Sequence, residues 1–300
     1  MRVVVHVGYQ KTATTALQAT VFPRVDKTWF LNREDEFFEF ARSIEGRPDA
    51  EQFSVARWRP YLDESRRRAP VLLLSREDFS NGRRWAMVAE RLHDLLPDAR
   101  IVVCVRNQAT MIPSLYSQHL KSGGYRSFRS WLRAFPVETF EYDRLVERYQ
   151  ELYGADAVSV LAFEHLVQDP DGFVALLCDT ISPGSPPVRD ADVLSVNRGL
   201  APPSRWTFRV ANRVFRRSAS NERPLLPAAF VWRAVESAVR RIDPVLFPRM
   251  GRAGSSADRR LVDELLPHFG PSNARLQTLT GLDLAGFGYP LAASAAAGSG

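Results

Sequence analysis

The stretch VGYQKTATTALQ at residues 7–18 follows a short apolar run, Val3–Val7, and places Lys11 three positions after Gly8. The apolar run is typical of a buried strand, and a helix is expected to begin near Ala13. A turn between a strand and a helix presents free backbone N–H groups at the positive end of the helix, where an anion can bind. The lysine adds a full positive charge, and further hydroxyl donors are Thr12, Thr14 and Thr15. The stretch therefore suits a phosphate or sulfate group.

This lysine-containing turn differs from the Walker A motif. That motif, GxxxxGK[ST], places its lysine after a second glycine. Here Lys11 precedes the threonines, and no second glycine follows. A tight turn with a surface lysine and a threonine cap is the alternative interpretation of the same residues.

Short apolar runs rich in valine and leucine recur along the first half of the chain and alternate with longer stretches of helical periodicity. Because such runs are typical of strands buried on both faces, they predict a parallel sheet built from β–α–β units with right-handed crossovers. The expected strands are Val3–Val7, Thr28–Leu31 (the weakest pattern), Val71–Leu74, Ile101–Val105 and Val158–Phe163. The predicted fold is three-layer α/β, with a central parallel sheet of about five strands and the ligand crevice at their carboxyl ends.

After residue 180 the pattern becomes mainly helical, beyond the loop SPGSPP at 182–187. The expected helices are Arg205–Arg216, Ala228–Arg241, Ala257–Phe269 and Ser272–Leu279. Residues 1–290 are predicted to form one domain, with an α/β core over 1–180 and a helical extension over 181–290. The low-complexity end, 291–300, is predicted to be a disordered tail.

Composition limits the classes of protein to which the chain can belong. Its 300 residues are 45% hydrophobic and 25% charged, as in ordinary globular proteins, and the formal charge of +6 suggests anionic ligands or partners. Cys104 and Cys178 lie in apolar runs and are expected to be buried thiols, and no metal-ligand spacing is visible. Because we find no signal peptide and no run of about 18 apolar residues, we expect a cytoplasmic protein.

A second stretch, VVCVRNQATMIPSLYSQHLK at residues 102–121, carries an arginine at the end of a predicted strand and a serine eight residues later. Arg106 is suited to bidentate contact with a phosphate, and Ser114 on the next helix can converge on the same anion. Together the two stretches indicate a ligand with two separated anionic groups.

Both stretches resemble motifs of the sulfotransferases that use 3′-phosphoadenosine 5′-phosphosulfate (PAPS). VGYQKTATTALQ is similar to the loop by which that family holds the 5′-phosphosulfate, and residues 102–121 resemble its 3′-phosphate element. FEHLVQDP at 163–170 and FGPSNARLQTLTGLDL at 269–284 resemble later segments of the family, so the likeness touches most of the chain. The resemblance implies a P-loop-like fold.

The chain departs from the family pattern at a few positions. Ala13 stands where the family usually has glycine, and Gln10 and Gln108 stand where proline is common. If position 13 requires a positive φ, alanine is strained there by about 1 kcal/mol or more.

The resemblance implies that Lys11 lies near the bridging oxygen between the sulfate and the phosphate of PAPS. The backbone amides of the turn would hold the 5′-phosphate, Arg106 and Ser114 would bind the 3′-phosphate, and a late loop around Arg198 would close on it. Sulfuryl transfer needs in-line positioning and neutralisation of charge, and this scheme requires no metal. The expected cofactor-binding residues are Lys11, Thr12, Ala13, Thr14, Thr15, Arg106, Ser114 and Arg198.

The acceptor hydroxyl needs a general base. Glu77 follows a predicted strand in LLLSREDFS at 72–80, so it is expected at the mouth of the sheet, and bacterial relatives look similar here. The alternatives are that this carboxylate caps the next helix, or that His119 is the base.

The sequence therefore predicts transfer of a sulfuryl group from PAPS to a hydroxyl of a carbohydrate, lipid or small-molecule acceptor, with no nucleic-acid partner. The alternatives are a P-loop kinase that uses a nucleoside triphosphate and a non-catalytic nucleotide-binding protein. The basic amphipathic segment SRWTFRVANRVFRR at 204–217 is either a packed helix with solvated arginines or a contact for an anionic acceptor or a membrane.

Overall fold

The computed structural model describes residues 1–31, 35–80, 84–191, 193, 200–246 and 256–292. Its contacts divide the chain into two compact units. The first unit comprises Met1–Asn107, Glu138–Asn197 and Phe269–Gly300, and the second comprises Gln108–Val137 and Arg198–His268. The predicted single domain with a boundary near residue 180 stays a prediction. Two predicted features, the site residue Arg198 and residues 293–300 of the tail, lie outside the described residues.

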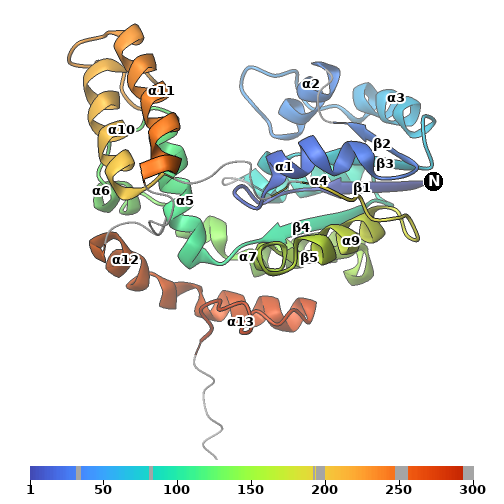
Figure 1. Ribbon diagram of the computed structural model, residues 1–300. Coiled ribbons are helices and arrows are strands. Elements are labelled where there is room, and N and C mark those ends of the chain that lie inside the picture. The colour runs from blue at the N-terminus through green and yellow to red at the C-terminus, as the bar shows by residue number, and fades with distance from the viewer. Residues whose placement is uncertain (32–34, 81–83, 192, 194–199, 247–255, 293–300) are drawn as a thin grey trace, which may run out of the picture. The chain divides into compact units, whose positions relative to one another are not determined.

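The centre of the first unit is a five-stranded sheet in the order β2-β3-β1-β4-β5, and every neighbouring pair of strands is parallel (Figure 1). The predicted α/β fold is confirmed. β3 lies on one side of β1 and β4 lies on the other, so the order in which strands are added to the sheet reverses at β1. Such a switch point favours a ligand crevice at the carboxyl ends of these strands. The strands are β1 (Arg2–His6), β2 (Thr28–Leu31), β3 (Val71–Ser75), β4 (Arg100–Val105) and β5 (Val158–Ala162).

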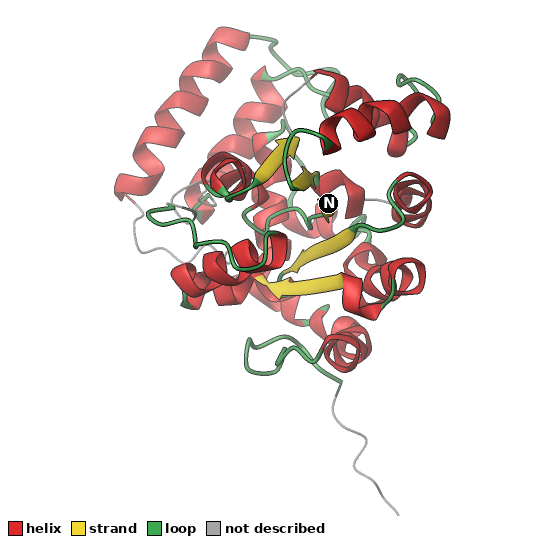
Figure 2. Ribbon diagram, turned by 90° about the vertical axis from the view of Figure 1, so that its right-hand side faces the viewer, coloured by secondary structure: helices red, strands yellow, loops and turns green. Residues whose placement is uncertain are grey.

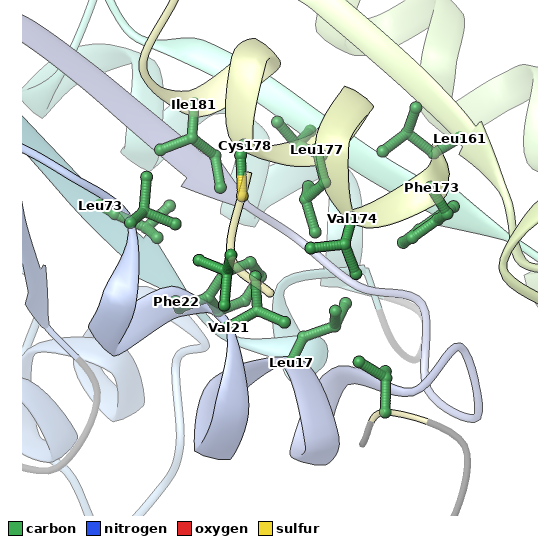
Figure 3. Packing of buried hydrophobic residues seen from close by; sticks show 14 of the residues in the cluster. Leu17, Val21, Phe22, Leu73, Leu161, Phe173, Val174, Leu177, Cys178 and Ile181 are labelled. Atoms are coloured by element: carbon green, nitrogen blue, oxygen red, sulfur yellow. The ribbon is translucent and has the colours of Figure 1, made fainter. Parts of the chain in front are cut away.

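One face of this sheet is covered by α1 (Thr14–Thr20) and α9 (Pro170–Ile181). Side chains from both helices meet those of β3 and β5 in one apolar cluster (Figure 3). Cys178 of α9 and Cys104 of β4 belong to this cluster and are free, so the prediction of buried thiols is confirmed. Figure 2 shows helices on both sides of the strands.

The remaining helices of the first unit pack on the sheet or on one another. Among them, α7 contacts β4, β5 and α4. No residue of α7 belongs to the apolar cluster that contains α1 and α9. The helices are α2 (Asp35–Ile44), α3 (Val55–Arg66), α4 (Trp85–Leu95), α7 (Tyr142–Tyr153), α8 (Phe163–Gln168) and α13 (Gly270–Thr280). The short 3-10 turns, of which η4 and η6 span the borders between the two units in sequence, are η1 (Phe22–Arg24), η2 (Glu77–Ser80), η4 (Val137–Phe140), η5 (Ala155–Ala157) and η6 (Leu266–Phe269).

The second unit is built from helices that one buried asparagine joins together. Asn212 Nδ2 donates to the carbonyl oxygens of Leu120 and Gly124, each at 2.7 Å, and its Oδ1 accepts from Trp232 Nε1 at 2.8 Å. No helix in the described part of the chain has both the length and the apolar character needed to cross a membrane. The helices are α5 (Gln108–Lys121), α6 (Phe128–Leu132), α10 (Pro202–Phe215), α11 (Ala229–Leu246) and α12 (Ser256–Asp263).

A buried histidine at the end of β1 makes stability depend on pH. His6 is fully buried, its Nδ1 lies 2.8 Å from Ser75 Oγ, and its ring packs edge-on against Phe22. Burial lowers the pKa of His6 from 6.5 to about 4. As the pH falls below 6.5, the unfolded chain binds a proton that the folded chain does not, so the folded state loses stability until about pH 4.

We expect the free energy of unfolding to fall by about 2 kcal/mol between pH 6.5 and roughly pH 5 through this group. Urea unfolding at the two pH values measures the difference, and His6→Asn, which does not titrate, is the control. If His6→Asn shows the same loss as the native chain, the pH dependence comes from other groups.

Candidate functional site

The segments that follow three neighbouring strands meet at one edge of the sheet, within the first unit. The loop after β1 carries Lys11, the turn after β3 carries Glu77, and Arg106 comes directly after β4. A Cβ atom at Gly8 would lie 3.0 Å from both the Cα and the carbonyl oxygen of Glu77, so the first two segments are in close contact. Gly8 also has φ 100°, so only glycine fits this position.

The loop after β1 is held in an uncommon backbone conformation. Lys11 has φ 67° and Ala13 has φ 66°, both in the left-handed region that side chains with a Cβ disfavour. The positive φ considered from the sequence at position 13 is therefore present.

Replacing Ala13 by glycine is expected to raise the free energy of unfolding by about 0.5–1 kcal/mol, because relief of left-handed strain outweighs the added entropy of the unfolded chain. Urea unfolding measures this. Ala19 is the matched control, since it lies exposed inside α1, where glycine should cost about 1 kcal/mol. Destabilisation at both positions would mean that the loop stores no such strain.

The threonines of the loop stabilise its own turn. Thr12 Oγ1 donates to the Tyr9 carbonyl oxygen at 2.5 Å, and Thr14 Oγ1 donates to the same oxygen at 3.2 Å. Both side chains are buried, whereas Thr15 is exposed. The backbone amides of Lys11, Ala13, Thr14 and Thr15 donate to no acceptor in the described part of the chain. These amides, rather than the hydroxyls of Thr12 and Thr14, are the donors that an anion would meet.

Arg106 joins the second sequence motif to the first. Its Nη1 donates to the carbonyl oxygen of Lys11 at 2.8 Å, and its guanidinium lies 4.3 Å from the centre of the Phe163 ring. Tyr142 OH donates to the Arg106 carbonyl oxygen at 2.7 Å. The strand-end arginine and the lysine loop, 95 residues apart in sequence, are therefore in direct contact.

The charges at this edge of the sheet are coupled. Burial lowers the pKa of Lys11, the Arg106 guanidinium lowers it further, and Glu77 opposes both. Burial likewise raises the pKa of Glu77; Asp78 adds to the rise, while Lys11 and Arg76 oppose it. An anion bound beside Lys11 and Arg106 would relieve their mutual repulsion. A carboxylate with a raised pKa is a better proton acceptor near neutral pH.

A buried hydrogen-bond network next to Arg106 was not predicted from the sequence. Glu164, the second residue after β5, accepts from the backbone N–H of Asn107 at 3.1 Å and from Tyr289 OH at 2.8 Å. Asn107 Nδ2 donates to the Gly288 carbonyl oxygen at 2.6 Å. Burial lowers the pKa of Arg106, and the Glu164 carboxylate partly offsets this. The position of Glu164 after a predicted strand was a usable signal, whereas nothing local marked Tyr289.

Two predicted site residues belong to the second unit. Ser114 and His119 both lie on α5, and their expected roles beside the residues of the first unit stay predictions. His119 stacks against Tyr116 and contacts the Trp131 ring. Its ring also leaves no room for a Cβ at Gly124, and burial lowers its pKa. His119 is therefore part of an aromatic cluster.

Comparison with known proteins gives a family match over part of the chain and a shared fold. Residues 86–182 match the model of the sulfotransferase family; this segment contains Arg106 and Glu164, whereas Lys11 and Glu77 precede it. A search of curated proteins finds no match. Among solved structures, the chain is similar to a sulfotransferase from Alicyclobacillus acidocaldarius, at 17% identity and a TM-score of 0.58 over 96% of this chain and 99% of that one. The match to the sulfotransferase family model covers residues 86–182, and the similarity to the solved sulfotransferase shows a shared fold.

Proposed function

We propose that the protein transfers a sulfuryl group from PAPS to a hydroxyl of a carbohydrate, lipid or small-molecule acceptor. The observation that carries this proposal is the contact between Arg106 and the Lys11 loop, beside Glu77. Transfer of a sulfuryl group from a doubly anionic nucleotide requires positive charge, hydrogen-bond donors and a base. This site supplies them as two cations, a set of backbone amides and one carboxylate.

In the proposed reaction, the acceptor oxygen forms a bond to sulfur as the bond between sulfur and the 5′-phosphate oxygen breaks. Glu77 takes the proton of the acceptor hydroxyl, and burial supports this role because it raises the pKa of the carboxyl. Lys11 neutralises the charge that develops on the leaving phosphate oxygen. The leaving product is adenosine 3′,5′-bisphosphate.

The 3′-phosphate is assigned to Arg106. Phe163 lies against its guanidinium, and Tyr142 holds its carbonyl group, so its position is defined on both sides. The role of Ser114 beside it is taken from the sequence, and Ser114→Ala tests that role separately.

Calorimetric titration with adenosine 3′,5′-bisphosphate, beside ATP with Mg²⁺, tests the proposal. We expect the bisphosphate to bind more tightly, and Arg106→Ala to weaken its binding by about 10- to 100-fold, since charge-assisted hydrogen bonds are lost. Arg144→Ala is the control, because Arg144 is exposed and pairs only with Glu141 in the described part of the chain. Preference for ATP with Mg²⁺ would instead favour the kinase alternative.

A further inference from the structure

The α10–α11 hairpin, residues 202–246, concentrates two surface properties within the second unit. α10 and α11 lie side by side, and the segment between them runs back along the end of α10 (Figure 1). Leu226 N donates to the Val214 carbonyl oxygen at 2.8 Å, which fixes this connection. The two helices and the segment between them therefore form one structural element with a fixed arrangement.

The hairpin carries all of the net charge of the chain. It contains nine arginines and three carboxylates, a balance of +6, and the whole chain also has a formal charge of +6. The other 255 of the 300 residues are thus balanced. The arginines are Arg205, Arg209, Arg213, Arg216, Arg217, Arg223, Arg233, Arg240 and Arg241.

Some of these arginines contact an aromatic ring or a carboxylate within the hairpin, and others form no ion pair there. Arg216 lies 4.0 Å from the centre of the Trp232 ring, and Arg240 pairs with Glu236 at 2.8 Å. By contrast, four exposed arginines make no ion pair with the described part of the chain; they are Arg217, Arg223, Arg233 and Arg241. These four are available to an external anionic surface.

The hairpin also exposes most of the large apolar side chains that face solvent. Of the twelve exposed large hydrophobic residues in the described part of the chain, eight lie between Trp206 and Leu246. Phe230 is 77% exposed, and Leu225 and Leu226, in the segment before α11, are 63% and 64% exposed. Exposed apolar side chains gathered in one place mark an interaction surface.

We propose that the α10–α11 hairpin binds the surface of an anionic lipid bilayer. The exposed apolar side chains would enter the boundary between headgroups and acyl chains, and the arginines would contact the anionic headgroups. A second copy of the chain fits less well, since pairing this surface with itself would bring like charges together. A nucleic acid would match the arginines, but it would leave the apolar side chains in water.

Flotation with lipid vesicles tests this proposal, with no nucleotide or acceptor present, so its outcome is independent of sulfuryl transfer. We expect the native chain to float with vesicles that contain phosphatidylglycerol, to bind phosphatidylcholine vesicles far more weakly, and to be released in part by salt. Leu226→Ser with Phe230→Ser should weaken binding by about tenfold or more, because both side chains lose apolar burial.

Matched variants outside the hairpin separate this surface from general effects. Val167→Ser with Leu176→Ser removes two exposed apolar side chains from the first unit and should leave binding unchanged. Arg217→Gln, Arg223→Gln and Arg233→Gln together should weaken binding by roughly 100-fold, since each arginine near an anionic membrane contributes about 1 kcal/mol. Arg67→Gln, Arg129→Gln and Arg133→Gln remove the same charge from exposed positions elsewhere and should have a much smaller effect.

Three results would overturn the proposal. The first is that the folded native chain fails to float with anionic vesicles. The second is that the hairpin variants and their matched controls lose binding equally. The third is a dimer in analytical ultracentrifugation that Leu226→Ser with Phe230→Ser dissociates, which would assign the surface to a second copy of the chain. Circular dichroism of every variant establishes that the losses are not caused by unfolding.

Discussion

Replacing Lys11 by alanine is expected to lower kcat for sulfuryl transfer by about 100- to 1000-fold. The proposed role of its ammonium is to neutralise charge that develops on the leaving oxygen, and this charge is largest in the transition state. The loss should therefore appear in kcat more than in the affinity for adenosine 3′,5′-bisphosphate. Transfer from labelled PAPS to a model acceptor, together with calorimetry, measures both quantities.

Lys27→Ala is a closely matched control for this experiment. Lys27 has φ 57°, so replacing it by alanine leaves a left-handed residue with a Cβ, as at Lys11. Its side chain is 67% exposed and, among the residues that the structure describes, forms an ion pair only with Asp26, at 3.8 Å. Because the two substitutions have similar backbone consequences, the difference between them isolates the Lys11 ammonium. Equal losses of kcat in the two variants would contradict the proposed role.

Replacing Glu77 by glutamine is expected to lower kcat by about 100- to 10,000-fold while binding of adenosine 3′,5′-bisphosphate is retained. Glutamine keeps the shape of the side chain but cannot accept a proton from the acceptor hydroxyl. In the native chain, kcat should rise with pH as Glu77 loses its proton, and this rise should lie above the ordinary carboxyl range, because burial raises the pKa of Glu77. The residual activity of Glu77→Gln should lack this rise.

The pH dependence of kcat in Asp78→Asn distinguishes a base from a structural residue at position 77. A merely structural Glu77 would leave this pH dependence unchanged. Asp78 raises the pKa of Glu77 by its charge, and it also pairs with Arg76 at 3.0 Å. Removing the Asp78 charge should therefore move the rise in kcat to lower pH without a large loss at the plateau. If Glu77→Gln keeps native kcat and His119→Gln loses it, the base is His119 and the assignment to Glu77 is wrong.

The α/β fold was predictable because its signal is local. A strand buried on both faces is apolar at nearly every position, so the run at Val3–Val7, with His6 as its one polar residue, marks the central strand without any knowledge of its neighbours. The edge strand Thr28–Leu31 is only partly buried, and its pattern was correspondingly weaker. α10 begins three residues before the predicted Arg205, because two prolines occupy its first turn, where a missing N–H costs nothing.

The candidate site was predictable only in part. Lys11, Glu77 and Arg106 each follow a strand, and parallel strands end at the same edge of a sheet, so their proximity could be expected. The sequence did not indicate that the Thr12 and Thr14 hydroxyls would be used by the turn itself.

The sequence alone determined the order of strands and helices along the chain, the lysine loop and the strand-end arginine. Each of these features depends on residues that are adjacent in the chain. Only the tertiary structure decided that Arg106 donates to Lys11, 95 residues away, and that Tyr289 donates to Glu164, 125 residues away. Such contacts have no local pattern, because they depend on which elements the folded chain brings together. The division into two units, each composed of separate segments, was decided in the same way.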